Sequence, residues 1–327
     1  MRIEEFIKPG PATETTDSGA RPDAGILEPS PGLDSGASKP AGAAVTIPTQ
    51  KAAAPAWVLP LEHFSYTGLQ MLEICPEQWR NRYVLGRKEP PAQALLLGKV
   101  THGGVEYGLA HKALTEQDPD LDSMLAYYHD LVWPDTLDAY GGKGEVIWDD
   151  SPDEVRGQGE RMVKAYHPTI SRLEPETVEE EFTLDLGLPI PVKGWIDLTQ
   201  KHGRPSVDLK TSQSRRSKLR PDWRVQARVY QLAQPMPVDF HVITKAKHPA
   251  VVTGLEETGL VEPYRENHAL QMSRRLGQAL WSANYYYATY GPDETWPTRG
   301  IHHDWRCDFC AYRDAMASYP GCPEWSE

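Results

Sequence analysis

The chain has 327 residues, enough for one large domain or two with a substantial apolar core. Its formal net charge of −12 argues against a protein that coats nucleic acid indiscriminately, although a local basic strip can still guide a DNA backbone. The N-terminus lacks the charged and apolar regions of a signal peptide, and no apolar run is long enough to span a bilayer. We therefore expect a soluble, cytoplasmic protein with no membrane partner and with reduced cysteines.

Residues 1–56 are predicted to be a disordered tail, followed by one folded domain over residues 57–327. From about Gly10 to Pro55 the chain is rich in Pro, Ala, Gly, Ser and Thr and nearly free of aromatic residues. Such a segment cannot bury enough apolar surface to offset the entropy lost on ordering. A helicase or recombinase partner is an expectation for this tail, and the sequence leaves open whether it recruits any.

The first part of the folded domain is predicted to be helical. Ser65 or Thr67 is a candidate N-cap for the first helix, and Pro76 suits the first turn of the second. Gly103-Gly104 lies inside a longer helix and indicates tight packing against a neighbour. We expect helices ending at residue 74 and spanning residues 77–84, 94–113, 121–140 and 152–166.

The second part alternates strands with helices. Strands are predicted at residues 178–184, 192–198, 206–210 and 238–244, and helices at residues 221–233 and 270–290. The first three strands form an antiparallel meander, and a cysteine-bearing coil ends the chain. This order favours an α/β fold with a mixed central sheet flanked by helices.

The second and third predicted strands carry the most informative polar pattern. If His202-Gly203 forms a two-residue hairpin loop, Asp197 faces Asp208, and Lys210 shares the face of Asp208. Opposed carboxylates repel unless a positive charge lies between them, and Mg²⁺ accepts carboxylate oxygens. The lysine then orients or deprotonates an attacking water. The alternative is a solvated hairpin face without function.

A basic strip follows this hairpin. It is the main cluster of positive charge in the chain and runs into the predicted helix at residues 221–233. Such a run is usually a solvated face, but here it lies where a phosphate backbone would pass. We expect DNA contacts from Arg215, Arg216, Lys218 and Arg224.

Four short motifs occur in a fixed order along the domain. They are Gly98-x-x-x-His102-x-x-x-Glu106, Gly194-Trp195-Ile196-Asp197, Asp208-Leu209-Lys210 and Gln226-x-x-x-Tyr230. With these motifs the sequence resembles a RecB-type nuclease of the PD-(D/E)XK superfamily, closest in layout to the CRISPR-associated RecB-like exonucleases. The resemblance covers roughly residues 60–325 and implies a restriction-endonuclease-like core.

The resemblance implies a divalent metal site for Mg²⁺ or Mn²⁺. His102, Asp197 and Asp208 would bind the metal together with the backbone carbonyl of Leu209. Lys210 would position the attacking water and stabilise developing charge. A lone histidine on a mostly apolar helix is more often a core residue than a ligand, and only the motif series favours ligation by His102.

Gln226 and Tyr230 would order the site and the nearby phosphate, whereas Glu106 is ambiguous between a site-facing group and a solvated helix residue. The activity implied is a DNA exonuclease acting on linear or single-stranded ends, in repair, recombination or DNA processing. An endonuclease with the same site stays open, as does a DNA-binding recombination-accessory module with a vestigial site.

The cysteines form one distant residue and a C-terminal trio, namely Cys75, Cys307, Cys310 and Cys322. A zinc ribbon normally presents two C-x-x-C pairs, and only Cys307 and Cys310 make one here. The pattern resembles the [4Fe–4S] staple of the iron–sulfur subset of the family, although the interval before Cys322 is longer than usual there. Four unrelated buried cysteines are the alternative.

Overall fold

The structure is a computed structural model that describes residues 56–87, 89–258, 264–298, 307, 310, 312–313 and 321–322. The chain divides into two units, Met1–Lys8 with Trp57–Glu327, and Pro9–Ala56. Residues 1–55 lie outside the described residues, so the disordered tail stays a prediction. The architecture given below is that of the unit that begins at Trp57.

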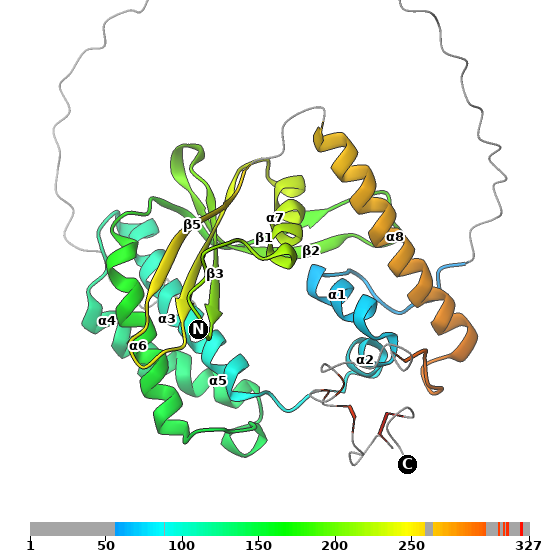
Figure 1. Cartoon of the computed structure of the whole chain (residues 1–327), viewed down its shortest axis with the longest axis horizontal. Helices are drawn as coiled ribbons and strands as arrows, with labels where there is room; N and C mark the ends of the chain where they lie inside the picture. The colour runs from blue at the N-terminus through cyan, green and yellow to red at the C-terminus, as the bar shows by residue number, and fades with distance from the viewer. Residues whose placement is uncertain are drawn as a thin grey trace, which may run out of the picture. The chain divides into compact units, whose positions relative to one another are not determined.

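Five strands form one mixed sheet in the order β1-β2-β3-β4-β5 (Figure 1). Three neighbouring pairs are antiparallel, whereas β3 and β4 are parallel and are joined through helix α7. The α/β fold and the antiparallel meander are confirmed. The strands are β1 Pro175–Leu184, β2 Val192–Gln200, β3 Ser206–Ser212, β4 Val238–Thr244 and β5 Val251–Glu257.

The predicted helices are present, but two of them contain a π-helical segment. The helix expected over residues 77–84 continues from α2 into η2, and the helix expected over residues 121–140 is divided by η3. Strand β5 was not predicted; it contains Gly254 at φ 76°. Ser65 caps the first helix by accepting the Gly68 N–H. The helices are α1 Tyr66–Ile74, α2 Pro76–Trp79, η2 Arg80–Val84, α3 Gln93–Thr115, α4 Leu121–Tyr127, η3 Tyr128–Val132, α5 Trp133–Ala139, η4 Lys143–Glu145, α6 Pro152–Ile170, η5 Lys201–Gly203, α7 Pro221–Ala233 and α8 Tyr264–Tyr290.

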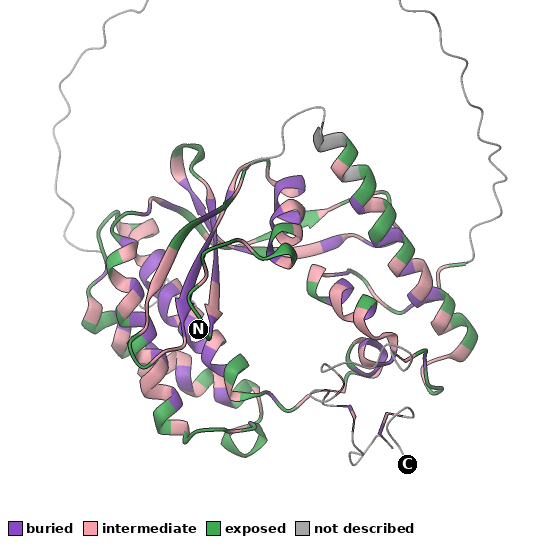
Figure 2. Cartoon of the chain, in the orientation of Figure 1, coloured by how far each residue is buried: buried purple, intermediate pink, exposed green. Residues whose placement is uncertain are grey.

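The sheet separates two apolar clusters; β3 and β4 are mostly buried, whereas β1 and β5 are largely exposed or half-buried (Figure 2). Helices α3 to α6 lie on one side, and α1, α2, α7 and α8 lie on the other (Figure 1). The first cluster includes Val100, Met162, Leu198, Val207 and Leu209. The second includes Ile196, Trp223, Phe240, Leu276 and Leu280.

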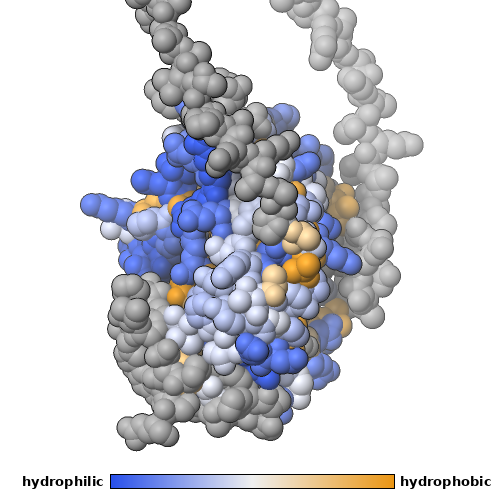
Figure 3. Space-filling model, turned by 90° about the vertical axis from the view of Figure 1, so that its right-hand side faces the viewer, coloured by the Kyte–Doolittle hydropathy of each residue, from blue (hydrophilic) through white to orange (hydrophobic). Residues whose placement is uncertain are grey.

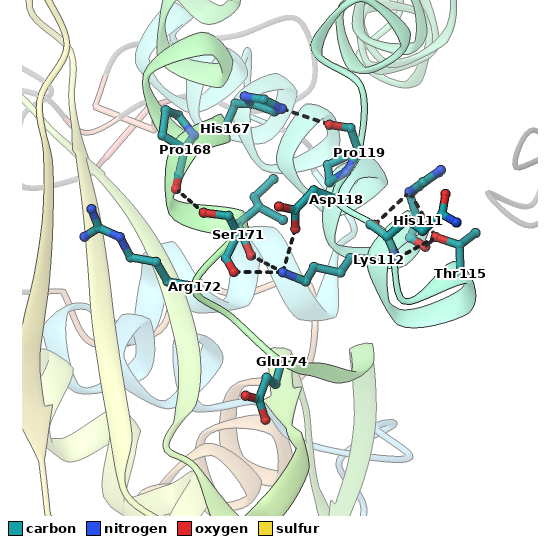
Figure 4. A network of polar contacts seen from close by, with 12 residues as sticks. His111, Lys112, Thr115, Asp118, Pro119, His167, Pro168, Ser171, Arg172 and Glu174 are labelled. Atoms are coloured by element: carbon teal, nitrogen blue, oxygen red, sulfur yellow. Dashed lines mark hydrogen bonds and ion pairs between the residues drawn. The ribbon is translucent and has the colours of Figure 1, made fainter. Parts of the chain in front are cut away.

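A lysine of α3 contacts the C-terminal end of α6. The ammonium of Lys112 donates to the carbonyls of Ile170 and Ser171, both at 3.0 Å, and to Asp118 at 2.7 Å (Figure 4). The last carbonyls of a helix lack partners within it and carry partial negative charge. Lys112 therefore satisfies the C-terminal end of α6 and holds it beside α3.

The glycines of α3 allow close helix packing, as their sequence positions predicted. A Cβ atom on Gly103 would lie 2.7 Å from Val132, and one on Gly104 would lie 2.7 Å from Val163. Distances this short require a neighbour to move. Helix α3 is thus held at a fixed distance from α6 and η3 by the absence of side chains.

No helix in the described part of the chain combines the length and the apolar character needed to cross a bilayer. In the coloured part of the face seen in Figure 3, hydrophilic and near-neutral residues predominate, with a few small hydrophobic patches.

We expect Gly104→Ala to destabilise the protein by about 1–3 kcal/mol, because the added methyl group overpacks the contact with Val163. Gly157→Ala on α6 is the matched control. Its Cβ would meet only Arg161 at an ordinary 3.5 Å, so this change should stabilise by about 0.5–1 kcal/mol. Urea denaturation measures both, and equal effects would contradict the packing argument.

Candidate active site

The hairpin brings two carboxyl groups face to face. Leu198 pairs with Val207 across β2 and β3, which places Asp197 opposite Asp208, in the register that the sequence predicted. The two-residue loop is confirmed: the Arg204 N–H donates to the Lys201 carbonyl at 3.4 Å, and His202 and Gly203, at φ 60° and 67°, lie between them.

Asp208 is the most buried acid of this pair, with a side chain only 1% exposed. The hydroxyl of Tyr230 donates to its Oδ1 at 3.0 Å, and the amide of Gln226 donates to the same oxygen at 3.2 Å. The Gln226 amide also donates to the Tyr230 hydroxyl at 2.6 Å. Two residues one turn apart on α7 therefore hold one oxygen of Asp208.

Asp197 is held through its own carboxylate. Its Oδ2 accepts the backbone N–H of Leu209 at 2.6 Å, and its side chain is 15% exposed. Burial raises the pKa of Asp197 well above its ordinary value, and the facing Asp208 raises it further. The pair therefore requires a nearby positive charge to stay ionised.

Lys210 supplies that charge within the chain. Its ammonium forms an ion pair with Oδ2 of Asp208 and lies over the ring of Phe240. Burial by itself lowers the pKa of Lys210, but attraction to Asp208 and Asp197 outweighs it, and the pKa is raised. Lys210 thus stays protonated at neutral pH, which favours charge stabilisation over the deprotonation of water.

His102 reaches the acid pair from α3. Its Nδ1 lies 3.9 Å from Oδ2 of Asp197. Burial lowers the pKa of His102 to about 4, and the charge of Lys210 lowers it further. The imidazole is therefore neutral at pH 7, the form in which histidine binds metals.

His102, Asp197 and Lys210 line a cleft of about 810 Å³. Asp208, Gln226 and Tyr230 are not among its lining residues. Residues from α3, η3, α5, β1, β2 and β3 form its walls together with Thr67 of α1. Its ionisable side chains are Lys99, His102, Glu106, Glu179, Asp197 and Lys210.

Glu179 is a residue that the sequence analysis missed. Its neighbours Val178 and Glu180 pair with Leu198 and Ile196, which flank Asp197, so Glu179 lies beside the acid pair. The sequence pattern predicts only a strand at residues 178–184 and gives Glu179 no role. Because Glu179 adopts φ 53°, simple strand alternation does not give its direction.

Glu106, which the sequence left ambiguous, faces the cleft. Burial raises the pKa of Glu106 to about 8, and the neighbouring carboxylate of Glu179 raises it as well. The two side chains share a hydrogen bond. At neutral pH the Glu106 carboxyl is therefore mostly protonated.

The donor chemistry fits a divalent cation. Among the described residues, no three His, Cys, Asp or Glu side chains lie in a metal-binding arrangement as they stand. A neutral imidazole and two facing carboxylates are nevertheless ligands that hard divalent metals accept. Oδ2 of Asp208 makes no hydrogen bond within the described part of the chain and contacts only the Lys210 ammonium as an ion pair.

The predicted DNA-binding residues lie near this region but do not line the cleft. Arg215 and Lys218 are exposed between β3 and α7, and Arg216 donates to the Ser212 hydroxyl at 3.2 Å. Arg224 forms an ion pair at 3.0 Å with Glu257 of β5. Its charge is therefore partly neutralised within the protein.

The four cysteines are partly buried, and none forms a disulfide. Burial raises the pKa of the Cys310 thiol to about 11, and the nearby Cys75 and Cys322 contribute in the same direction. Cys310 also donates its N–H to the Cys307 carbonyl at 3.2 Å. Residues far apart in the sequence thus lie close enough to influence one another.

A family model for the PD-(D/E)XK nuclease superfamily matches residues 63–315. No curated protein sequence matches the chain.

Two solved structures resemble it weakly. A candidate exonuclease from Eubacterium rectale has a TM-score of 0.41 and 13% identity, covering 68% of this chain and 82% of that one. The protein SSO0001 has a TM-score of 0.32 and 10% identity, covering 76% and 95%.

Glu106 makes the metal-free protein sensitive to alkaline pH. A carboxyl whose pKa is raised on folding stabilises the protein fully below its unfolded pKa, and this contribution is lost as the pH rises through about 8. The free energy of unfolding should therefore fall between pH 5 and pH 8.5, and fall less in Glu106→Gln. Urea denaturation in chelator measures both slopes.

The exposed Glu176→Gln is the control for this experiment, and its slope should match that of the wild type. Equal slopes for the wild type and Glu106→Gln would refute the assignment of the raised pKa to Glu106.

Proposed function

The chain belongs to the PD-(D/E)XK nuclease superfamily, and on that premise we propose that it is a metal-dependent DNA exonuclease. It hydrolyses phosphodiester bonds at linear or single-stranded DNA ends, in repair, recombination or DNA processing. Residues 57–327 form the nuclease domain. The observation that carries the proposal is the buried pair of facing acids, Asp197 and Asp208, with Lys210 one strand step away beside an open cleft.

The proposed cofactor is Mg²⁺ or Mn²⁺. His102, Asp197 and Asp208 would hold the ion together with the carbonyl of Leu209. When bound, the cation supplies Lewis acidity at the phosphate and lowers the pKa of the attacking water. The pKa of Asp197, raised by burial and then by the facing Asp208, supports this assignment, because a cation at the acid pair would compensate both effects.

The protein side chains have separate roles in this proposal. Lys210 stays protonated and directs positive charge at the phosphoryl oxygens, where negative charge develops in the transition state. Gln226 and Tyr230 act through Asp208, because both donate to the same carboxylate oxygen. They are therefore positioning residues.

DNA would approach along the loop between β3 and α7. Arg215, Arg216 and Lys218 offer positive charge there, with a smaller contribution from the ion-paired Arg224. Binding by such a local strip on an acidic protein should weaken steeply as salt increases. The N-terminal tail would recruit a helicase or recombinase partner, if the protein has one.

The proposed second cofactor is a [4Fe–4S] cluster on Cys75, Cys307, Cys310 and Cys322. Four thiolates are the usual ligand set of such a cluster. The mutual influence of Cys75, Cys310 and Cys322 supports this ligand set. The cluster would join α2 to the end of the chain and act structurally.

The decisive experiment compares linear and covalently closed circular DNA in Mg²⁺ or Mn²⁺, with wild type and Asp208→Asn. We expect wild type to digest linear DNA and spare circles, and the rate of the variant to fall at least roughly 100-fold. The substitution removes a charged ligand of the proposed cation, and this cation would stabilise the negative charge that develops on the phosphate. Asp138→Asn, on the exposed surface of α5, should retain wild-type activity.

Cutting of circles would identify an endonuclease with the same site. If wild type and Asp208→Asn bind DNA equally and neither cleaves it, the chain is a binding module with a vestigial site.

Protein purified without oxygen should be brown, with broad absorbance near ~400 nm, and should contain iron and sulfide. Cys310→Ser removes one proposed ligand and should abolish the colour. Metal and sulfide analysis checks this expectation. A colourless wild type with stoichiometric zinc would replace the cluster with a zinc site.

A further inference from the structure

Trp195 is an exposed aromatic side chain on the wall of the cleft. It is 46% exposed, and no other tryptophan in the described part of the chain falls in the exposed class. The indole stacks on no aromatic ring among the described residues, whereas Trp57, Trp79 and Trp223 each have an aromatic neighbour. A large apolar ring is thus held in water beside the acid pair.

Its position on β2 sets its distance from Asp197, where the phosphate would react. Trp195 precedes Asp197 by two residues, about 7 Å along the strand, and both side chains line the cleft. This is close to the reach from a phosphate to the base of its own nucleotide. Leu95, which is 51% exposed in the first turn of α3, also lines this cleft.

The charges of the cleft limit how a DNA strand can be held there. Lys99 and Lys210 are its lining cations, against the carboxyl groups of Glu106, Glu179 and Asp197. Two cations among these acids give the cleft itself few contacts for phosphates, and Arg215, Arg216 and Lys218 lie outside its lining. Contact with a base is a further way to hold a nucleotide inside the cleft, and an aromatic face provides it for every base.

We propose that Trp195 stacks on the base of the nucleotide next to the scissile phosphate, with Leu95 of the same cleft as a second apolar contact. Because a base within a duplex is paired and stacked on its neighbours, an unpaired base reaches the indole ring at a lower free-energy cost. Trp195 then favours single-stranded or frayed ends. This inference rests on the proposed nuclease function and adds a specificity-determining residue to it.

The test compares kcat/KM of the full-length wild type, Trp195→Ala, Trp195→Phe and Tyr285→Ala on a single-stranded oligonucleotide. Tyr285 is the matched control, because it is an aromatic residue that is 59% exposed and does not line the cleft. We expect Trp195→Ala to lose roughly 10-fold, Trp195→Phe to retain most activity, and Tyr285→Ala to match the wild type.

A second set of oligonucleotides carries one abasic nucleotide at successive positions near the end. For the wild type, an abasic nucleotide at one position should lower kcat/KM by a factor similar to that of the Trp195→Ala substitution. For Trp195→Ala, the same abasic nucleotide should not lower kcat/KM further, because removing the ring and removing the base eliminate the same contact. Equal losses by both proteins at every position, or unchanged activity in Trp195→Ala, would overturn the proposal.

Binding separates this proposal from the nuclease activity. An oligonucleotide with 2-aminopurine near its end is titrated with each protein in chelator, where no cleavage occurs. Quenching by wild type and by Tyr285→Ala but not by Trp195→Ala supports the stacking site, even if the wild type proves inert and the nuclease proposal fails. Quenching that is absent, or equal in all proteins, rejects it.

Discussion

The repulsion between two buried acids, Asp197 and Asp208, is the constraint on which the rest of the site depends. Register places them opposite each other, and burial raises the free-energy cost of leaving both ionised. Three neighbouring groups stabilise the two carboxylates. Lys210 contributes positive charge beside Asp208, Tyr230 donates a hydrogen bond to Asp208, and the backbone N–H of Leu209 donates to Asp197.

The acid pair is held on packed secondary structure rather than on loops, which is what keeps such groups in a reproducible geometry. Glycine makes two of the contacts possible. A Cβ on Gly194 would lie 2.6 Å from the ring of Phe182, which in turn packs edge-on against Tyr230. Gly104 lets α3 pack closely against α6. This packing positions α3 so that His102 lies near Asp197.

The N-terminal helices are also joined to the segment after α8 by hydrogen bonds that involve no cysteine. The buried carboxylate of Glu77 accepts two hydrogen bonds from Arg80, at 2.8 and 2.6 Å, and one from the Trp296 N–H at 2.8 Å. A buried, fully paired network of this kind specifies one arrangement. A cluster on the cysteines would therefore reinforce a closure that the chain already makes.

The sequence by itself determined most of the secondary structure and the facing of Asp197 and Asp208, because local propensity and strand register depend on near neighbours. It did not reveal β5 or the π-helical segments. The tertiary structure decided the charge states. Lys210 is protonated, His102 neutral and Glu106 raised in pKa because of groups brought near through space. It also placed Glu179 in the cleft, where its positive φ changed its direction and no strand pattern could have shown it.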